Sequence, residues 1–367
     1  MTNQQEAKRV LSLRRIVIPI LLGLSVGAYL IYQSVDLEAL KSISWTSTEF
    51  YVWFAVAILL IITRAFAYMY RLKVISDNQL SWKQTFQVVM LWEFSSCVTP
   101  GLVGGAAVAI FLLNKEKINL GKSTAMVVLV TFLDNLIFIV FIPLLLIFIG
   151  PKVLFATGTC AEADQLPILN YVSSISVAVV IVYITLLIIT IFLGYGILVK
   201  PRAAKFFFLK LSRWQIFKRF KDGLIATGME MEVAGKEFKS RNASFWKSVI
   251  GSTIVVWFVR FLLANSLILG ITGSFDDQLM ILARQFVIWM VMILPSTPGG
   301  SGIAEIAFLA FICEFIPQGL SSTVVVLWRL LSYYLYIIIG AFVLPRWISR
   351  VFQKKDKDLS KMETDQM

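Results

Sequence analysis

Long apolar segments recur along the chain and limit what it can fold into. A helix needs roughly 20 apolar residues to cross the hydrocarbon core of a membrane, where no water can satisfy an open backbone. Only 15% of the residues are charged, against about 25% in soluble domains. The sequence therefore predicts an all-α polytopic membrane protein with six full transmembrane helices. They are expected at residues 16–33, 50–70, 124–149, 171–199, 248–271 and 323–344.

Two further apolar segments are interrupted by helix breakers. Thr99-Pro100-Gly101 divides segment 86–113, and Thr297-Pro298-Gly299-Gly300 divides segment 279–316. Proline removes a backbone donor, and glycine disfavours a helix interior by about 1 kcal/mol relative to alanine. We therefore expect each segment to form a re-entrant hairpin of two half-helices, which enters and leaves the membrane on the same side.

The distribution of Lys and Arg predicts the orientation of the chain. Of the 34 Lys and Arg residues, 28 fall in five segments, and only Lys41 and Lys152 fall in the loops on the opposite side. Basic residues concentrate in cytoplasmic loops, so both termini are expected in the cytoplasm of a cell membrane. The net charge of +12 then reflects topology rather than nucleic-acid binding. The five basic segments are the tails 1–15 and 345–367 and the loops 71–85, 114–123 and 200–247.

The two interrupted segments belong to an internal repeat. With a shift of 198 positions, thirteen of the 31 positions from Thr99 to Leu129 match those from Thr297 to Leu327 without a gap. The charge distribution orients the two copies oppositely, and inverted repeats with broken helices are typical of transporters that alternate access. We expect repeat 1 at about 50–149 and repeat 2 at about 248–344, within a single transmembrane domain 16–344.

Ionisable residues lie within the apolar segments. A charge at the bilayer centre costs roughly 2.5 kcal/mol or more, so such residues need partners or a function. They either form buried pairs that fix the register of the helices or line a site. We expect Arg284 and Glu314 near the outer surface, and Glu93 about two turns before the first break. Those expected deepest are Arg64, Arg260, Arg329, Asp134 and Glu305.

Arginines beside glycine-rich breaks predict an anion site. Backbone N–H groups at a break favour anions, and the guanidinium fork donates two hydrogen bonds to a phosphate. We therefore expect a cavity for an anionic group with an apolar tail, such as a phospholipid or a polyprenyl phosphate. Alternatively, the breaks only let helices turn and pack closely. The predicted substrate-binding residues are Arg64, Arg260, Arg329, Thr99, Pro100, Gly101, Thr297, Pro298, Gly299, Gly300, Glu305 and Asp134.

Several kinds of chemistry lack their usual residues. The chain has no histidine, which removes the commonest metal ligand and proton shuttle, and it has no Walker or Rossmann motif. We therefore expect no metal, no cofactor and no enzymatic activity. Cys97, Cys160 and Cys313 lie far apart in the sequence, and only Cys160 is expected outside the membrane. No disulfide framework is predicted.

The long loop 200–247 interleaves basic residues with Phe and Trp. Residues 202–221 resemble an amphipathic helix that lies in the interface of an anionic leaflet. The other interpretation is ordinary positive-inside bias combined with packing beneath the helix bundle.

The motifs "TPGLVGGAA" and "TPGGSGIAE" resemble those of a known family, the flippase-like transmembrane region of lysylphosphatidylglycerol synthetases (multiple peptide resistance factors). The hydrophobic layout is similar over roughly residues 10–350. This resemblance implies movement of an aminoacylated phospholipid between leaflets. About 23 residues follow the last span, so we expect a stand-alone member without the soluble synthase domain. Ala107 stands where the second motif has Glu305, so the two half-sites are not equivalent.

The sequence thus favours a flippase-like transporter of an anionic phospholipid, an aminoacyl-phospholipid or a polyprenyl- or glycosyl-phospholipid. One alternative is an intramembrane enzyme acting on a lipid headgroup, with Glu93, Asp134 and Glu305 as acid–base candidates. Another is a non-transporting membrane partner of a lipid- or glycan-synthesis enzyme. The expected partners are membrane lipids and such an enzyme, and nucleic acid is not among them.

Overall fold

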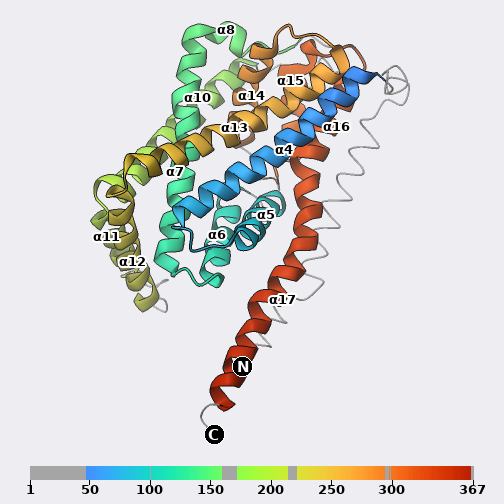
Figure 1. Cartoon of the computed structure of the whole chain (residues 1–367). Helices are drawn as coiled ribbons and strands as arrows, with labels where there is room; N and C mark the ends of the chain where they lie inside the picture. The colour runs from blue at the N-terminus through green and yellow to red at the C-terminus, as the bar shows by residue number, and fades with distance from the viewer. Residues whose placement is uncertain are drawn as a thin grey trace.

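The computed structural model describes residues 47–99, 101–158, 172–213, 221–293, 297 and 299–364. Every regular element within these residues is helical (Figure 1), so the all-α prediction is confirmed for this part of the chain. The expected first span, 16–33, and the tail 1–15 lie outside the described residues, as do Pro100 and Pro298.

Five helical segments are long and apolar enough to cross a membrane, and they confirm five of the six expected spans. The last of them contains a π-helical segment, η5, which joins two α-helices. The five are α4 (Thr48–Ile75), α7 (Leu120–Phe148), α10 (Val172–Gly194) with η2 (Tyr195–Val199), α13 (Ala243–Thr272), and α16 (Ser321–Arg329) with η5 (Leu330–Tyr334) and α17 (Leu335–Thr364).

Helices α4 and α13 form a long antiparallel pair through the centre of the molecule (Figure 1). At one end of the pair, Ser266 donates a hydrogen bond to the Trp53 carbonyl at 2.6 Å, and at the other end Tyr70 donates to Ser248 at 3.2 Å. Gly273, in the left-handed conformation, ends α13. This pair carries Arg64 on one helix and Arg260 on the other.

Each interrupted segment is divided into two helices where the breakers stand. The first gives α5 (Trp82–Val98) and α6 (Gly101–Lys115), and the second gives α14 (Gln278–Ile293) and α15 (Ile303–Ile312). With at most 17 residues, each helix is at most about 26 Å long, less than the roughly 30 Å of a bilayer core. Helices α5 and α6 lie in the lower half of Figure 1, and α14 and α15 lie at the top.

The loops expected in the cytoplasm gather at one end of the molecule, with α11 (Arg202–Leu211) and α12 (Lys221–Lys239). Asp77 accepts hydrogen bonds there from Lys122 at 3.3 Å and from Arg241, and Arg350 pairs with Glu116. These ion pairs join loops that are distant in the sequence. The structure thus collects the basic loops, as the Lys and Arg distribution requires.

The opposite end carries α8 (Pro151–Leu154) and the ion pair formed by Arg284 and Glu314 at 2.8 Å.

The cysteines differ in their bonding. Cys97 is buried and free, whereas Cys313 is disulfide-bonded. The expectation of a chain without disulfides was therefore wrong, because separation along the sequence does not measure separation in the fold.

Two apolar cores fill the helix bundle, and a layer of charged residues separates them. On α4, Ala57 belongs to one core and Met69 to the other, and Arg64 lies between them. The same change of core occurs on α7 at Asp134 and on α16 and η5 at Arg329. The fold therefore brings most of the predicted deep charges to one level, between two close-packed regions.

Candidate functional site

Arg64 pairs with Glu93 within this charged layer. Its Nη2 donates to both carboxylate oxygens of Glu93, at 2.9 and 3.0 Å, and its Nη1 donates to the Tyr336 hydroxyl at 2.6 Å. The Nε of Arg64 is buried and has no hydrogen-bond partner in the described part of the chain. One donor of this guanidinium is thus left over after the protein contacts are made.

Asp134 pairs with Arg71, a residue that the sequence assigned to a cytoplasmic loop. Arg71 donates to Asp134 at 2.5 Å and to Thr253 at 3.0 Å, and Trp257 donates to the same carboxylate oxygen at 3.0 Å. The Arg71 side chain is only 1% exposed. The loop assignment of Arg71 is therefore corrected, because α4 continues to Ile75 and carries this residue inside the bundle.

Arg329 lies against the second break and uses its donors there. It donates to Glu305 at 2.7 Å, to the Gly299 carbonyl at 3.3 Å and to Ser301 at 3.3 Å. Glu305 also accepts the N–H of Gly302 at 2.7 Å. This carboxylate occupies a backbone donor that was expected to bind an anion, and the Gly299 carbonyl presents an acceptor beside it.

Positive φ angles shape the second break. Gly299, Gly300 and Gly302 have φ of 59°, 67° and 86°, which side chains with a Cβ rarely adopt. A Cβ on Gly299 would lie 2.0 Å from the Tyr333 ring. Both the backbone conformation and the packing of this turn therefore require glycine at Gly299.

The two breaks approach each other at Tyr333. This residue packs on Gly299 of the second break, and its hydroxyl donates to the carbonyl of Cys97, at the end of α5, at 3.2 Å. Thr99 in the first break donates to the Ser95 carbonyl at 2.6 Å, and Thr297 in the second is exposed. The glycine-rich turns thus meet through one aromatic side chain rather than through an open anion nest.

Arg260 differs from the other arginines of this layer. Within the described residues it has neither an ion pair nor a hydrogen bond; its guanidinium stacks on Trp289, 3.9 Å from the ring centroid. Arg260 lies 17 residues from one end of α13 and 12 from the other, about 26 and 18 Å along the helix. This half-buried cation is therefore near the middle of a span, and its donors have no acceptor in the part of the chain that the structure describes.

Arg260 and Arg64 line one small cavity together with Ser332 and Tyr336. The Ser332 hydroxyl is buried without a hydrogen-bond partner among the described residues, as is the Nε of Arg64. The cavity has a volume of about 10 Å³, roughly the space for one water molecule. Its wall includes η5, and π-helical turns frequently mark functional sites. Donors from three elements that are unused among the described residues thus line a cavity with room for about one water molecule.

The model of the lysylphosphatidylglycerol synthase TM region matches residues 16–340 of this chain. The chain belongs to this family. Two members of the UPF0104 membrane proteins are similar to it. The Archaeoglobus fulgidus protein is 25% identical over 295 residues, covering 78% of this chain and 84% of its own. The Methanocaldococcus jannaschii protein is 25% identical over 281 residues, covering 75% and 77%. No solved structure matches the chain.

Some residues of the site in this synthase TM-region protein were not predicted. Arg71 follows Arg64 and Tyr68 at spacings of seven and three residues, which place all three on one helix face; that spacing was a usable signal. Ser332 stands where the repeat has Asp134 under the 198-residue shift, a second signal. No sequence signal predicted that Trp289 lies beside Arg260, because this contact depends on how α13 and α14 are rotated relative to each other.

Proposed function

We propose that the protein moves an anionic lipid between the leaflets of the membrane, and that Arg260 and Arg64 bind the lipid phosphate. The observation that carries this proposal is that Arg260, one nitrogen of Arg64 and the Ser332 hydroxyl lie around one cavity and have no hydrogen-bond partner among the described residues. The substrate class is an anionic phospholipid, an aminoacyl-phospholipid, or a polyprenyl- or glycosyl-phospholipid.

The energetic argument starts from the cost of a charge in a membrane. An arginine near the bilayer centre costs about 2.5 kcal/mol or more unless it is paired. Glu93, Asp134 and Glu305 are each paired with another arginine. An arriving phosphate would supply the missing counter-charge, and the planar guanidinium fork fits two of its oxygens.

Transport requires the cavity to open, since about 10 Å³ cannot hold a phosphate group. We propose that the two hairpins are re-entrant halves of an inverted repeat and that they give access from opposite leaflets in turn. Their position at opposite ends of the molecule supports this (Figure 1). Tyr333 contacts both breaks, so a movement of one hairpin could be transmitted to the other through this side chain.

We assign the end with α11 and α12 to the cytoplasm, with both termini on that side. The support is the concentration of Lys and Arg in the segments that gather there. A single cysteine placed at Ser240 should therefore react with an impermeant thiol reagent only from the cytoplasmic side. Reaction of that cysteine from the outside would reverse the assignment.

An enzymatic role receives less support from the same geometry. Each of the three acid–base candidates accepts hydrogen bonds from an arginine, so carboxylate lone pairs that a base would use are already occupied. We propose no catalytic activity for the chain. A role as partner of a lipid- or glycan-synthesis enzyme is compatible with transport, because the product of such an enzyme would be the cargo.

Reconstitution separates these functions. Proteoliposomes holding the full chain and headgroup-labelled phosphatidylglycerol should show faster transbilayer movement than empty vesicles, and the extracted lipid should be chemically unchanged. Phosphatidylcholine carrying the same label serves as the matched zwitterionic control and should move more slowly. A modified headgroup would favour the enzyme, and no protein-dependent movement of any anionic lipid class would reject the transport proposal.

A further inference from the structure

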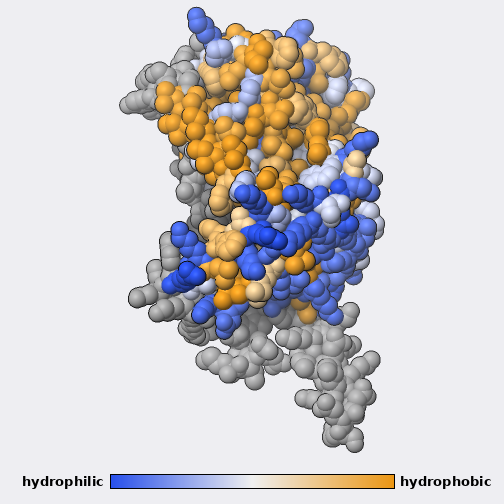
Figure 2. Space-filling model, turned by 90° about the vertical axis from the view of Figure 1, so that its left-hand side faces the viewer, coloured by the Kyte–Doolittle hydropathy of each residue, from blue (hydrophilic) through white to orange (hydrophobic). Residues whose placement is uncertain are grey.

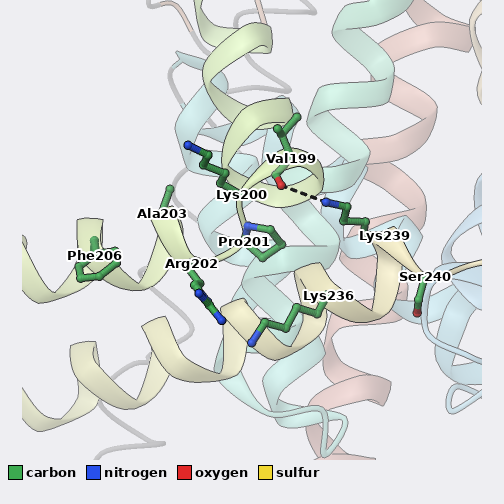
Figure 3. A pocket seen from close by; sticks show the side chains of 9 residues that line it. All are labelled: Val199, Lys200, Pro201, Arg202, Ala203, Phe206, Lys236, Lys239 and Ser240. Atoms are coloured by element: carbon green, nitrogen blue, oxygen red, sulfur yellow. Dashed lines mark hydrogen bonds between the residues drawn. The ribbon is translucent and has the colours of Figure 1, made fainter.

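A second cavity lies where η2 ends and α11 begins (Figure 3), and none of its lining residues belongs to the charged layer. Its volume is about 630 Å³, and its wall is formed by η2, α11 and α12. Four cationic side chains line it, whereas none of its nine described lining residues is acidic. The cations are Lys200, Arg202, Lys236 and Lys239.

One carboxylate beside the cavity is shared among several of these cations. Glu232 pairs with Lys236 at 2.7 Å and lies 3.7 Å from both Arg202 and Lys205. The hydrogen bond from Lys236 and the surrounding positive charge hold the pKa of Glu232 below its usual range, so the carboxylate is ionised at neutral pH. Lys200 has no ion pair among the described residues. Positive charge therefore remains in excess at the mouth of the cavity.

The frame of the cavity is close-packed. Gly235 lets α12 approach η2 so closely that a Cβ would lie 2.9 Å from the Ile197 carbonyl oxygen, and Gly228 does the same for α11 at Phe208. Lys239 donates to the Val199 carbonyl at 3.2 Å, the hydrogen bond drawn in Figure 3. The cavity is therefore part of a packed structure and not a gap between loose loops.

The position of the cavity relative to the membrane follows from the length of the apolar segment that precedes it. The apolar segment Val177–Val199 is 23 residues long, so it extends about 34 Å as a helix, slightly more than a bilayer core. Lys200 and Arg202 therefore emerge at the level of the lipid headgroups. Figure 2 shows this face of the molecule, where a broad apolar band gives way below to hydrophilic surface.

Apolar surface continues down to the cavity. On α10, Ile188, Ile191 and Phe192 are exposed, and Phe192 contacts Phe207 of α11, with ring centroids 6.3 Å apart. Phe206, at the edge of the cavity, is 66% exposed. An apolar strip that leads to a cluster of cations matches one ligand chemistry, an acyl chain joined to an anionic headgroup.

We infer that this cavity binds the headgroup of an anionic phospholipid of the adjoining leaflet, with the acyl chains against α10 and the aromatic face of α11. Lys200 and Arg202 contact the phosphate, and α11 lies in the interface. The site is separate from the central cavity and does not depend on transport, so it anchors the end of the bundle whether or not a lipid is moved.

Lipid retention in neutral detergent micelles tests this site. Every protein carries Arg260→Gln, which removes a lipid held by the central cavity, and native mass spectrometry measures bound phosphatidylglycerol against phosphatidylcholine. The additional pair Lys200→Gln with Arg202→Gln should weaken phosphatidylglycerol binding about 30-fold, at roughly 1 kcal/mol for each cation near the surface. The matched control, Lys221→Gln with Lys247→Gln, removes the same charge outside the cavity and should change binding little.

Three results would overturn the inference. An equal loss in the control pair would mean diffuse attraction to a basic surface. If inorganic phosphate displaced the bound phosphatidylglycerol at a concentration similar to that of the lipid, the cavity would be a site for soluble anions. If the double variant fails to fold, Phe206→Ser replaces it, since this exposed side chain is not needed for packing. Unchanged phosphatidylglycerol binding in a folded Phe206→Ser protein would reject the acyl-chain contact and the proposal with it.

Discussion

Arg329 and Arg260 both lie in long apolar helical segments, yet their surroundings differ. Arg329 donates to a carboxylate, a backbone carbonyl and a hydroxyl, all in or beside the second break. Arg260 contacts the face of Trp289 and, within the described residues, forms neither an ion pair nor a hydrogen bond. A fully paired buried arginine holds two elements together, whereas an unpaired one retains the capacity to bind a ligand.

The comparison assigns different tasks to two predicted binding residues. Arg329 and Glu305 close the turn of the second break and fix it against η5. The donors of Arg329 are thus used within the glycine-rich turn, whereas the anion site that we propose lies where Arg64 of α4 and Arg260 of α13 line one cavity. The same substitution should consequently lower the stability mainly at Arg329, and lower the rate of lipid movement with little change in stability at Arg260.

The largest loss of stability is expected for Arg329→Gln. The substitution leaves the largely buried Glu305, whose side chain is 18% exposed, without its counter-charge. Breaking a buried pair typically costs 3–5 kcal/mol, so the free energy of unfolding should fall by about 4 kcal/mol. Thermal unfolding in a mild detergent measures it. The double variant Arg329→Gln with Glu305→Gln should recover most of the loss, and no recovery would mean that the pair does not account for it.

A smaller loss is expected for Gly299→Leu. The new side chain meets the Tyr333 ring, and φ of 59° is unfavourable for leucine. Strain and overpacking together should cost about 2–4 kcal/mol, and lipid movement should fall because the turn is distorted. Gly300→Leu is the matched control: its nearest neighbour is the flexible end of Met292 at 3.0 Å. Equal unfolding temperatures for the two variants would show that contact with Tyr333 is unimportant.

The main elements could be predicted because each depends on local composition. Apolar length predicted α4, α7, α10, α13 and the α16–α17 span, and the Thr-Pro-Gly motifs marked where the two interrupted segments divide. These features need no knowledge of neighbouring helices, since a single helix must satisfy its own backbone in a membrane.

The partners of the charges could not be predicted in the same way. Asp134 could have paired with any arginine at its depth, and the choice of Arg71 follows from the rotation of α4 against α7. The π-helical turn η5 shifts the register of Ser332 and Tyr336 relative to Arg329. No residue type in Leu330–Tyr334 predicts a π-helical turn. At Gly302 the backbone N–H already donates to Glu305, one turn away, a contact that the sequence did not predict.

The smallest effect on stability, and the most direct test of the account, is Arg260→Gln. This substitution removes a charge that forms no ion pair among the described residues and leaves no carboxylate without its partner there. The free energy of unfolding should therefore stay within about 1 kcal/mol of the parent or rise. Arg260→Lys keeps the charge without the planar fork and should restore function only in part.

The decisive measurement is the rate of transbilayer movement of headgroup-labelled phosphatidylglycerol in proteoliposomes containing the parent or the Arg260→Gln protein, with unfolding temperatures recorded for both. The account predicts a rate at least about tenfold lower, equal to the loss of roughly 1.4 kcal/mol of interaction with the phosphate, at an unchanged unfolding temperature. A parental rate in the well-folded Arg260→Gln protein would contradict the claim that this unpaired arginine binds the transported anion.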